Sequence, residues 1–256
     1  MINSAESAER RLKRLNSMLK LNVIGKYGPY PKSGGACSSY LVEINDKKIL
    51  IDMGTGSLSN LQKKIKINDI DLILLSHLHS DHMVDSLVLR YALMVLKLKP
   101  IKLYMPGSPS IEHDMISSSE FYKTNIISEA LSFDFNGAKI SFKQTMHPVE
   151  TYAIKIEYYN KTFVFSSDTL KDDKIIDFAK NCDLFLCDSA FLEKDRKEGA
   201  PHPSALQAAI MAKKANVKKL LLTHISPLYN EIDVLNEAKT VFKSCEVVKE
   251  LKSYDI

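Results

Sequence analysis

The strongest constraint on the fold is a set of short apolar runs that each end in a polar residue. Runs of this kind are typical of parallel strands buried on both faces, which deliver functional groups at their carboxyl ends. The sequence therefore predicts one site at a shared sheet edge. The runs are residues 72–75 before Ser76-His77, 163–165 before Ser166-Ser167-Asp168, 184–187 before Asp188, and 220–222 before Thr223-His224.

The composition is that of a globular protein. Of 256 residues, 45% are hydrophobic and 26% are charged, with 9 Gly and 9 Pro, which excludes a disordered or collagen-like chain. No apolar run approaches the ~20 residues that a membrane span needs, and the first residues lack an apolar signal core. The four cysteines form no CxxC pair, so we expect reduced thiols, a cytoplasmic location and no membrane partner.

The positive charge is concentrated near the N-terminus. The chain has 35 basic and 31 acidic residues, and residues 1–20 alone contain five basic residues against two acidic ones. The rest of the chain is therefore close to neutral, which argues against a strongly basic nucleic-acid platform. Residues 1–20 also place apolar residues at helical spacing, so we predict an N-terminal helical extension. A docked surface helix, a solvated tail and a helix that binds a partner or a membrane surface all fit this pattern.

Residues 21–256 are predicted to form one α/β domain of mixed sheets covered by helices. Turn residues such as Asn136-Gly137 indicate hairpins in the first part, and strands alternate with helices in the last part. The expected strands are 21–24, 40–44, 48–51, 71–75, 101–104, 131–135, 138–142, 152–158, 162–165, 184–187 and 218–222. The expected helices are 57–64, 83–98, 172–180, 204–215 and 231–242.

The densest group of candidate ligands follows the strand at residues 71–75. In an extended segment His77, His79 and Asp81 point the same way, and His82, just before a helix expected to start at Met83, reaches from another direction. Four such side chains within six residues can hold two adjacent divalent ions. Imidazole and carboxylate ligands suit Zn²⁺, and Mn²⁺ or Fe²⁺ less well.

This spacing resembles the HxHxDH signature of the metallo-β-lactamase fold superfamily. The resemblance implies an αββα sandwich of two mixed sheets flanked by helices, with a hydrolase domain over residues 21–256. It also implies further metal ligands at His147, Asp168 and His224. One ion is then expected on His77, His79 and His147, the other on Asp81, His82 and His224, with Asp168 shared. Asp52 is expected to hold the ligand loop by hydrogen bonds without binding metal.

Within that superfamily the C-terminal part is similar to tRNase Z and its short relatives. The similar segments are His202-Pro203-Ser204-Ala205, residues 215–220 and His224-Ile225-Ser226-Pro227. The resemblance implies that His202 assists phosphodiester cleavage, paired with Asp188. The chain departs from the family by Asp188 in place of Glu, by Pro203-Ser204, and by Leu228 in place of Arg. Only 21 positions separate His147 from Asp168, too few for a tRNA-binding arm, so the chain resembles an armless relative.

The implied activity is hydrolysis of a phosphodiester, in RNA or in a small cyclic or nucleotide substrate. Two ions would share a hydroxide that attacks phosphorus, with Asp81 both binding metal and orienting the nucleophile. His202 would neutralise charge or donate a proton to the leaving oxygen. Thioesterase or lactonase chemistry, and a non-catalytic metal-binding regulator, are the alternatives. Related enzymes suggest a homodimer. The substrate-binding residues are not identified, although residues 27–39 are expected either to pass close to the metals or to form a surface turn.

Overall fold

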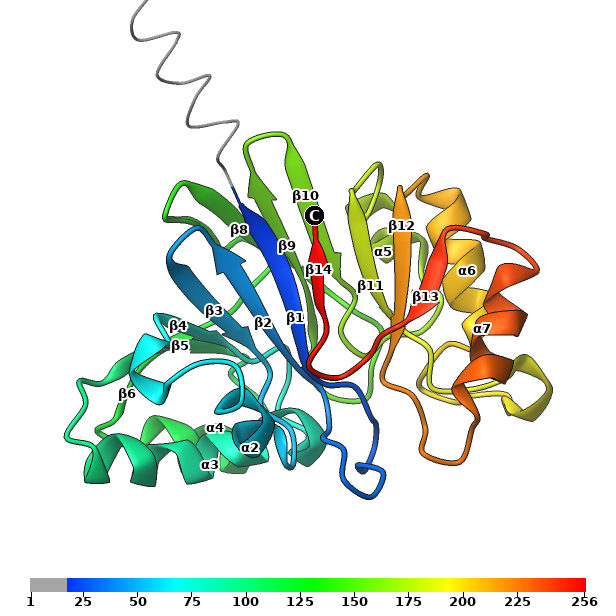
Figure 1. Cartoon of the computed structure of the whole chain (residues 1–256). Helices are drawn as coiled ribbons and strands as arrows, with labels where there is room; N and C mark the ends of the chain where they lie inside the picture. Colours follow the sequence, from blue (N-terminus) through cyan, green and yellow to red (C-terminus); the bar gives the residue numbers. More distant parts are fainter. Residues whose placement is uncertain (1–17) are drawn as a thin grey trace, which may run out of the picture.

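Two seven-stranded sheets face each other in the computed structural model, which describes residues 18–256 (Figure 1). The predicted N-terminal extension lies almost entirely outside the described residues. Its last two positions, Leu19 and Lys20, belong to the first strand, which begins two residues before the expected strand start at residue 21. Within residues 18–256 no helix is long and apolar enough to span a membrane.

The first sheet combines antiparallel and parallel strands. Its order is β14-β1-β2-β3-β4-β5-β6, antiparallel from β14 to β3 and parallel from β3 to β6. The strands are β1 (Leu19–Gly25), β2 (Ser39–Ile44), β3 (Lys47–Ile51), β4 (Leu72–Leu74), β5 (Ile101–Met105), β6 (Tyr122–Ile126) and β14 (Ser253–Asp255).

The second sheet repeats this arrangement. Its order is β13-β12-β11-β10-β9-β8-β7, parallel from β13 to β10 and antiparallel from β10 to β7. The strands are β7 (Ser132–Phe135), β8 (Ala138–Gln144), β9 (Tyr152–Tyr158), β10 (Lys161–Phe165), β11 (Leu184–Asp188), β12 (Lys219–Thr223) and β13 (Cys245–Val247).

Helices cover the outer face of each sheet, which confirms the predicted αββα sandwich. One apolar core fills the space between the sheets, and two others lie between each sheet and its helices. The helices α2 (Ser57–Leu61), α3 (Ser80–Val95) and α4 (Ser110–Ser117) cover the first sheet, and α5 (Asp173–Phe178), α6 (Ala205–Lys214) and α7 (Glu231–Lys239) cover the second. Short 3-10 helices lie at Ile67–Asp69 and Glu193–Asp195.

The strands that carry the candidate site all end at one edge of the sandwich. β3 and β4 are parallel in the first sheet, and β10, β11 and β12 are parallel in the second. β8 is separated from β10 by the antiparallel β9, so β8 also runs in their direction. The predicted convergence of strand ends therefore holds, and it brings loops from both sheets together.

Several elements differ from the sequence-based expectation. α3 begins at Ser80, three residues before the expected start at Met83, because the carbonyl of His79 already accepts hydrogen bonds from the N–H groups of His82 and Met83. Four further elements, α4, β6, β13 and β14, were not predicted from the sequence. α4 and β6 lie in a largely polar stretch, and β13 and β14 have three residues each, so neither pair carries a strong periodic signal.

The two sheets are joined near the site by a buried hydrogen bond. The Tyr40 hydroxyl on β2 lies 2.7 Å from Thr223 Oγ1 on β12, one residue before His224. Tyr40 is fully buried, so its hydroxyl depends on this contact and a longer one to Ser38. The hydrogen bond therefore fixes the end of β12 against the first sheet.

We expect Tyr40→Phe to destabilise the fold by about 1–2 kcal/mol, because Thr223 Oγ1 then loses its buried partner. Urea unfolding measures the change. Tyr159→Phe is the matched control: Tyr159 is 54% exposed, so its loss should change stability by less than about 0.5 kcal/mol. Equal stability of the two variants would show that the hydroxyl contact is unimportant.

Candidate metal centre

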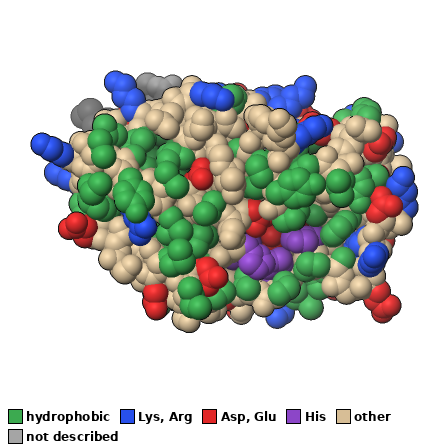
Figure 2. Space-filling view, turned by 90° about the horizontal axis from the view of Figure 1, so that it is seen from below, with side chains coloured by type: hydrophobic (Ala, Val, Ile, Leu, Met, Phe, Trp, Pro, Cys, Tyr) green, Lys and Arg blue, Asp and Glu red, His purple; other side chains and the backbone are tan. Residues whose placement is uncertain are grey.

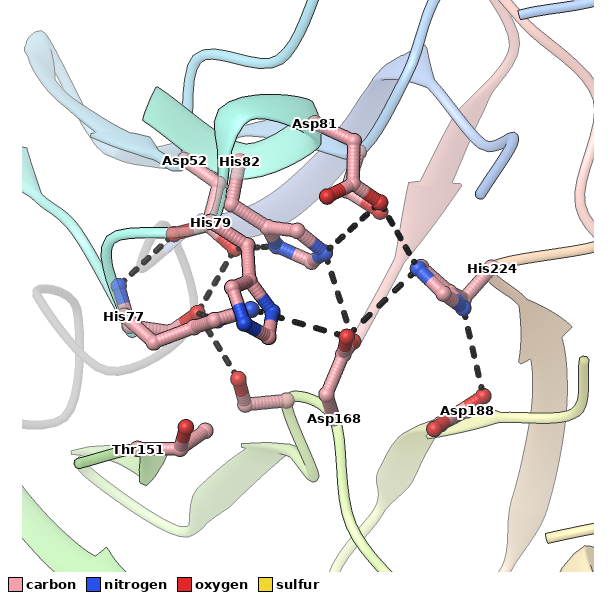
Figure 3. Close-up of polar contacts among 12 residues, drawn as sticks. Asp52, His77, His79, Asp81, His82, Thr151, Asp168, Asp188 and His224 are labelled. Atoms are coloured by element: carbon pink, nitrogen blue, oxygen red, sulfur yellow. Dashed lines mark hydrogen bonds and ion pairs between the residues drawn. The ribbon is translucent and has the colours of Figure 1, made fainter. Parts of the chain in front are cut away.

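The loop between β4 and α3 holds the densest part of the site. His77 precedes the helix, His79 is extended at its N-cap, and Asp81 and His82 lie in the first turn of α3. The expectation that Asp81 extends in line with His77 and His79 is therefore wrong. The helix turns Asp81 away from them and toward His224, whose Nε2 lies 3.2 Å from Asp81 Oδ2 (Figure 3).

Asp52, directly after β3, holds this loop in place by hydrogen bonds. It is fully buried, and its carboxylate accepts hydrogen bonds from Ser76 N at 2.7 Å and Ser76 Oγ at 2.8 Å. Its Oδ2 also lies 2.8 Å from His82 Nδ1. When His82 donates from Nδ1, its Nε2 stays available and faces Asp168 Oδ1 at 3.3 Å. The geometry matches the supporting position expected for Asp52.

Three histidines gather on one side of Asp168. His77 Nε2 lies 3.5 Å from Asp168 Oδ2, and His147 Nε2 lies 3.8 Å from the same oxygen and 3.2 Å from His79 Nδ1. One ligand-type atom from each of these four residues lies within 4.8 Å of all the others. The structure thus brings together the residues expected for the first ion.

A second group forms on the other side of Asp168. Ligand-type atoms of Asp81, His82 and His224 lie within 4.8 Å of one another. His224 Nε2 is 3.6 Å from Asp168 Oδ2, and His82 Nε2 is 3.3 Å from Asp168 Oδ1. Asp168 therefore lies between both groups, at the shared position. Asp168 does not cap the following helix, because the N-cap of α5 is Asp172, which accepts a hydrogen bond from Lys174 N.

A third pair, His202 and Asp188, adjoins the second group. His202 Nδ1 lies 2.8 Å from Asp188 Oδ2, and the rings of His202 and His224 stack with centroids 4.8 Å apart. Asp188 Oδ1 also faces His224 Nδ1 at 3.5 Å, so one carboxylate contacts both imidazoles. The link from Asp188 to His224 was not foreseen in the sequence. Ser204, not His202, caps α6.

Three site residues have a backbone conformation that side chains other than glycine rarely adopt. Asp52, Ser167 and His224 have φ angles of 58°, 53° and 55° and each lies one or two residues beyond a strand end. Such strained positions persist where surrounding contacts hold them, and they cluster at functional sites. His224 and Asp168, which lies next to Ser167, point toward each other (Figure 3).

Two glycines allow the backbone to approach the site closely. A Cβ at Gly28 would overlap the His224 imidazole, and a Cβ at Gly54 would overlap the Asp81 carbonyl oxygen. The loop after β1 therefore lies against a candidate ligand, which favours the expected position near the site over a plain surface turn. In the sequence, only the position of Gly54 two residues after Asp52 indicated that this glycine lies near the site. Nothing in the sequence indicated this for Gly28.

Charge compensation divides the histidines into two kinds. Burial lowers the pKa of His77 well below its usual value and that of His147 to about 4. Burial also disfavours charge on His82 and His224, but the carboxylates of Asp168 and Asp81 outweigh it, so that the pKa of His82 rises to about 10 and that of His224 rises well above its usual value. His77, His79 and His147 are thus neutral at pH 7. His82 and His224 instead hold protons next to Asp81 and Asp168.

The donor set fits divalent cations. Four imidazole nitrogens are buried and lack a hydrogen-bond partner among residues 18–256: His77 Nε2, His82 Nε2, His147 Nδ1 and His224 Nδ1. Of these, His77 Nε2 and His82 Nε2 both face Asp168. Unpaired buried polar atoms are costly, and cations bound beside Asp168 would satisfy His77 Nε2 and His82 Nε2.

Comparison with known proteins decides the family. Residues 33–224 match the model of the metallo-beta-lactamase superfamily. The chain belongs to this superfamily. The "probable metallo-hydrolase YhfI" of Bacillus subtilis is 31% identical over 233 aligned positions, and the alignment covers 88% of this chain and 94% of that protein. Its crystal structure covers 93% of this chain and all of YhfI, with a TM-score of 0.89 and 29% identity.

Relatives of the ribonuclease Z type are also similar to this member of the superfamily. Ribonuclease Z of Chlamydia pneumoniae is 27% identical over 297 aligned positions, covering 93% of this chain and 96% of the relative. The alignment is longer than the 256 residues of this chain, so that relative contains residues with no counterpart here. The short form of human tRNase Z shares the fold, with a TM-score of 0.75 at 17% identity over 92% of this chain and 98% of that one. The chain is thus a metallo-hydrolase with relatives of the ribonuclease Z type.

We expect Asp52→Asn to weaken Zn²⁺ binding by about 10–100-fold, because the amide no longer fixes the His82 proton on Nδ1. Competition with a chelator of known affinity measures the change. Asp85→Asn is the control, since Asp85 accepts a hydrogen bond from Leu58 N and contacts none of the candidate ligands. Unchanged Zn²⁺ affinity of Asp52→Asn would contradict the supporting role.

Zn²⁺ binding near pH 7 should release about one to two protons, because His82 and His224 carry protons that a cation must displace. Affinity should therefore fall as the pH is lowered. Calorimetry in buffers of different ionisation enthalpy measures the released protons. Heats that do not depend on the buffer would show that both imidazoles are already neutral.

Proposed function

We propose that this chain is a dinuclear metal-dependent phosphodiesterase. The observation that carries the proposal is the His202–Asp188 pair. It lies beside the candidate ligands but belongs neither to the group of three histidines (His77, His79 and His147) nor to the group that contains Asp81. The side chain of His202 is 15% exposed, whereas those of His77 and His82 are fully buried. His202 is therefore accessible to a substrate, and Asp188 fixes its orientation.

The proposed ligand sets follow the geometry on the two sides of Asp168. His77, His79 and His147 would hold one ion, and Asp81, His82 and His224 the other, with Asp168 between them. Zn²⁺ suits this mixture of imidazole and carboxylate, and Mn²⁺ or Fe²⁺ suits it less well. Bound ions would supply a nucleophile from water at neutral pH and would neutralise charge on the substrate oxygens.

His202 and Asp81 are the proposed catalytic residues of the chain itself. Asp188 Oδ2 accepts a hydrogen bond from His202 Nδ1–H, so Nε2 remains to stabilise charge at phosphorus or to protonate the leaving oxygen. Asp81 is partly exposed and lies between His82 and His224, where a carboxylate can orient the attacking water. Asp188 acts through His202 and His224 and is a positioning residue.

The rim of the site favours a small substrate over transfer RNA. Only the β9–β10 hairpin lies between His147 and Asp168, where the tRNase Z family places its arm. The nearby side chains of Tyr30, Met146 and Leu228 are 50%, 53% and 80% exposed. Figure 2 shows histidine side chains at the surface with hydrophobic side chains on both sides. Short RNA or a cyclic nucleotide therefore fits the proposal better than a long polyanion.

Carboxyl chemistry of the thioesterase or lactonase type is the second candidate, because the same nucleophile attacks carbonyl carbon and the rim is apolar. A metal-binding regulator without activity is the third. The four cysteines are free and buried, which supports the proposed cytoplasmic location. A homodimer remains a prediction.

We expect His202→Ala to lower turnover of bis-p-nitrophenyl phosphate by about 10²–10³-fold while metal content stays unchanged, because in the proposed mechanism His202 acts on the substrate and is not a ligand of either ion. Metal analysis and steady-state kinetics measure both. His113→Ala on α4 is the control, since that histidine lies outside the site. Full turnover by His202→Ala would refute the assignment.

Metal-loaded protein should hydrolyse bis-p-nitrophenyl phosphate faster than a model thioester or lactone, and precursor transfer RNA poorly, because the chain has no arm. A substrate panel at equal enzyme concentration tests this order. Preference for the thioester or lactone would establish the carboxyl hydrolase. Inactivity on the whole panel, with metal bound and a macromolecule retained in pull-down, would favour the regulator.

A further inference from the structure

The outer side of α3 is as apolar as its buried side. Met83 and Leu93 pack into the core between the helix and the first sheet. Val88, Tyr91 and Val95 lie on the opposite side at spacings of three and four residues, and each is more than half exposed. A helix that is apolar all round is normally buried on every side. Among residues 18–256, however, no element covers this side of α3.

Charged side chains do not replace that cover. Apart from Asp81 and His82 at the candidate metal centre, the charged residues of α3 are Asp85 and Arg90. Asp85 is directed toward α2, where its carboxylate accepts a hydrogen bond from Leu58 N at 2.8 Å. Arg90 is only partly exposed. The charged, solvated side that a surface helix normally has is therefore missing from α3.

α4 extends the apolar surface. It packs beside α3, and its exposed residues Ile111 and Met115 are one helical turn apart. A cavity of about 450 Å³ joins the two elements, because Tyr91 and Met94 of α3 line it together with residues 118–121, which follow α4. Hydrophobic side chains gather over this part of the molecule, on the left in Figure 2.

We call this surface the helical face. It consists of six large apolar side chains that are 45–73% exposed: Val88, Tyr91, Met94, Val95, Ile111 and Met115. Together they offer roughly 600 Å² of apolar surface, at the upper limit of what monomeric proteins expose in one patch. Each partner in a standard stable interface buries about 800 Å². The helical face therefore supplies most of the surface that a dimer needs.

The charges beside the helical face fit a second copy of the chain. Arg90 Nε is buried without a hydrogen-bond partner, and Arg90 pairs with no carboxylate, among residues 18–256. α4 carries two carboxylates, Glu112 and Asp114, and no lysine or arginine. The same surface thus has both members of a charge pair, as a self-complementary interface requires. A helix that lies on a membrane surface is instead rich in lysine and arginine.

We infer that the helical face binds the same face of a second copy, which gives a two-fold symmetric dimer. Tyr91 and Met94 of both copies would then be buried against apolar side chains, and Arg90 of each copy would face α4 of the other. The inference concerns a surface outside the candidate metal centre and does not depend on the proposed phosphodiesterase activity.

Sedimentation velocity of the full chain tests the inference. We expect a dimer with a Kd of about 10 μM or tighter, because the buried surface is close to that of a standard interface. A chain that stays monomeric up to about 100 μM would overturn the inference. Binding of such a monomer to phosphatidylglycerol vesicles would show that the helical face is a membrane surface instead.

The variant Val88→Lys/Val95→Lys should weaken dimerisation by about tenfold or more, because it places like charges on both sides of the interface. Lysine suits an exposed helical position at least as well as valine, so the variant should fold, which circular dichroism checks. Tyr159→Lys/Ile232→Lys is the matched control: both residues are more than half exposed and lie outside the helical face, so dimerisation should be unchanged. A dimer that survives in the α3 variant, or equal loss in both variants, would overturn the inference.

Discussion

The site depends on the buried carboxylate of Asp52, which connects three segments: the end of β3, the loop after β4 and the first turn of α3. Asp52 accepts hydrogen bonds from the loop after β4 and lies against the first turn of α3, while it is itself fixed at the end of β3. Ser76 extends the connection, because its hydroxyl accepts a hydrogen bond from Ser167 Oγ at 2.7 Å, next to Asp168 of the second sheet. The position of Asp168 is therefore linked through two hydroxyls to Asp52. The ligand groups of the two sheets share one support.

This support matters because the site concentrates polar groups in a place that water reaches poorly. Burial alone would disfavour every charge there. Asp81 and Asp168 stay ionised because neighbouring imidazoles compensate them. His82 and His224 lower the pKa of Asp81 despite burial, and His224, His82 and His77 hold that of Asp168 well below its usual value. Protons on His82 and His224 and cations at the same place are alternatives, since both balance Asp81 and Asp168. The buried carboxylates of Asp81 and Asp168 thus need positive charge beside them, from protons or from cations.

The sequence predicted the layers and the candidate residues because both arise from local signals. Apolar runs before Asp168, Asp188 and His224 mark buried strands, and the ligand spacing from His77 to His82 is compact. The sequence did not reveal the start of α3, since helical hydrogen bonds begin before the apolar residues that signal the helix. It also could not show the contact of Asp188 with His224 or the close approach of Gly28. These depend on strands that are distant in sequence and adjacent in space.

The departures from the ribonuclease Z pattern lie both at a strand end and in loops: Asp188 is the last residue of β11, whereas Pro203-Ser204 and Leu228 lie outside the strands and helices. Asp52, Asp168, Asp188 and His224 lie within three residues of strand ends, where the sheets fix the backbone. His202 lies on a longer connection between β11 and α6, held by Asp188 and by Arg196 Nε, which donates to the His202 carbonyl. A loop supported at such points tolerates Pro203 and Ser204 without moving the imidazole. The candidate ligands at the strand ends are therefore held more tightly by the fold than His202 on its loop.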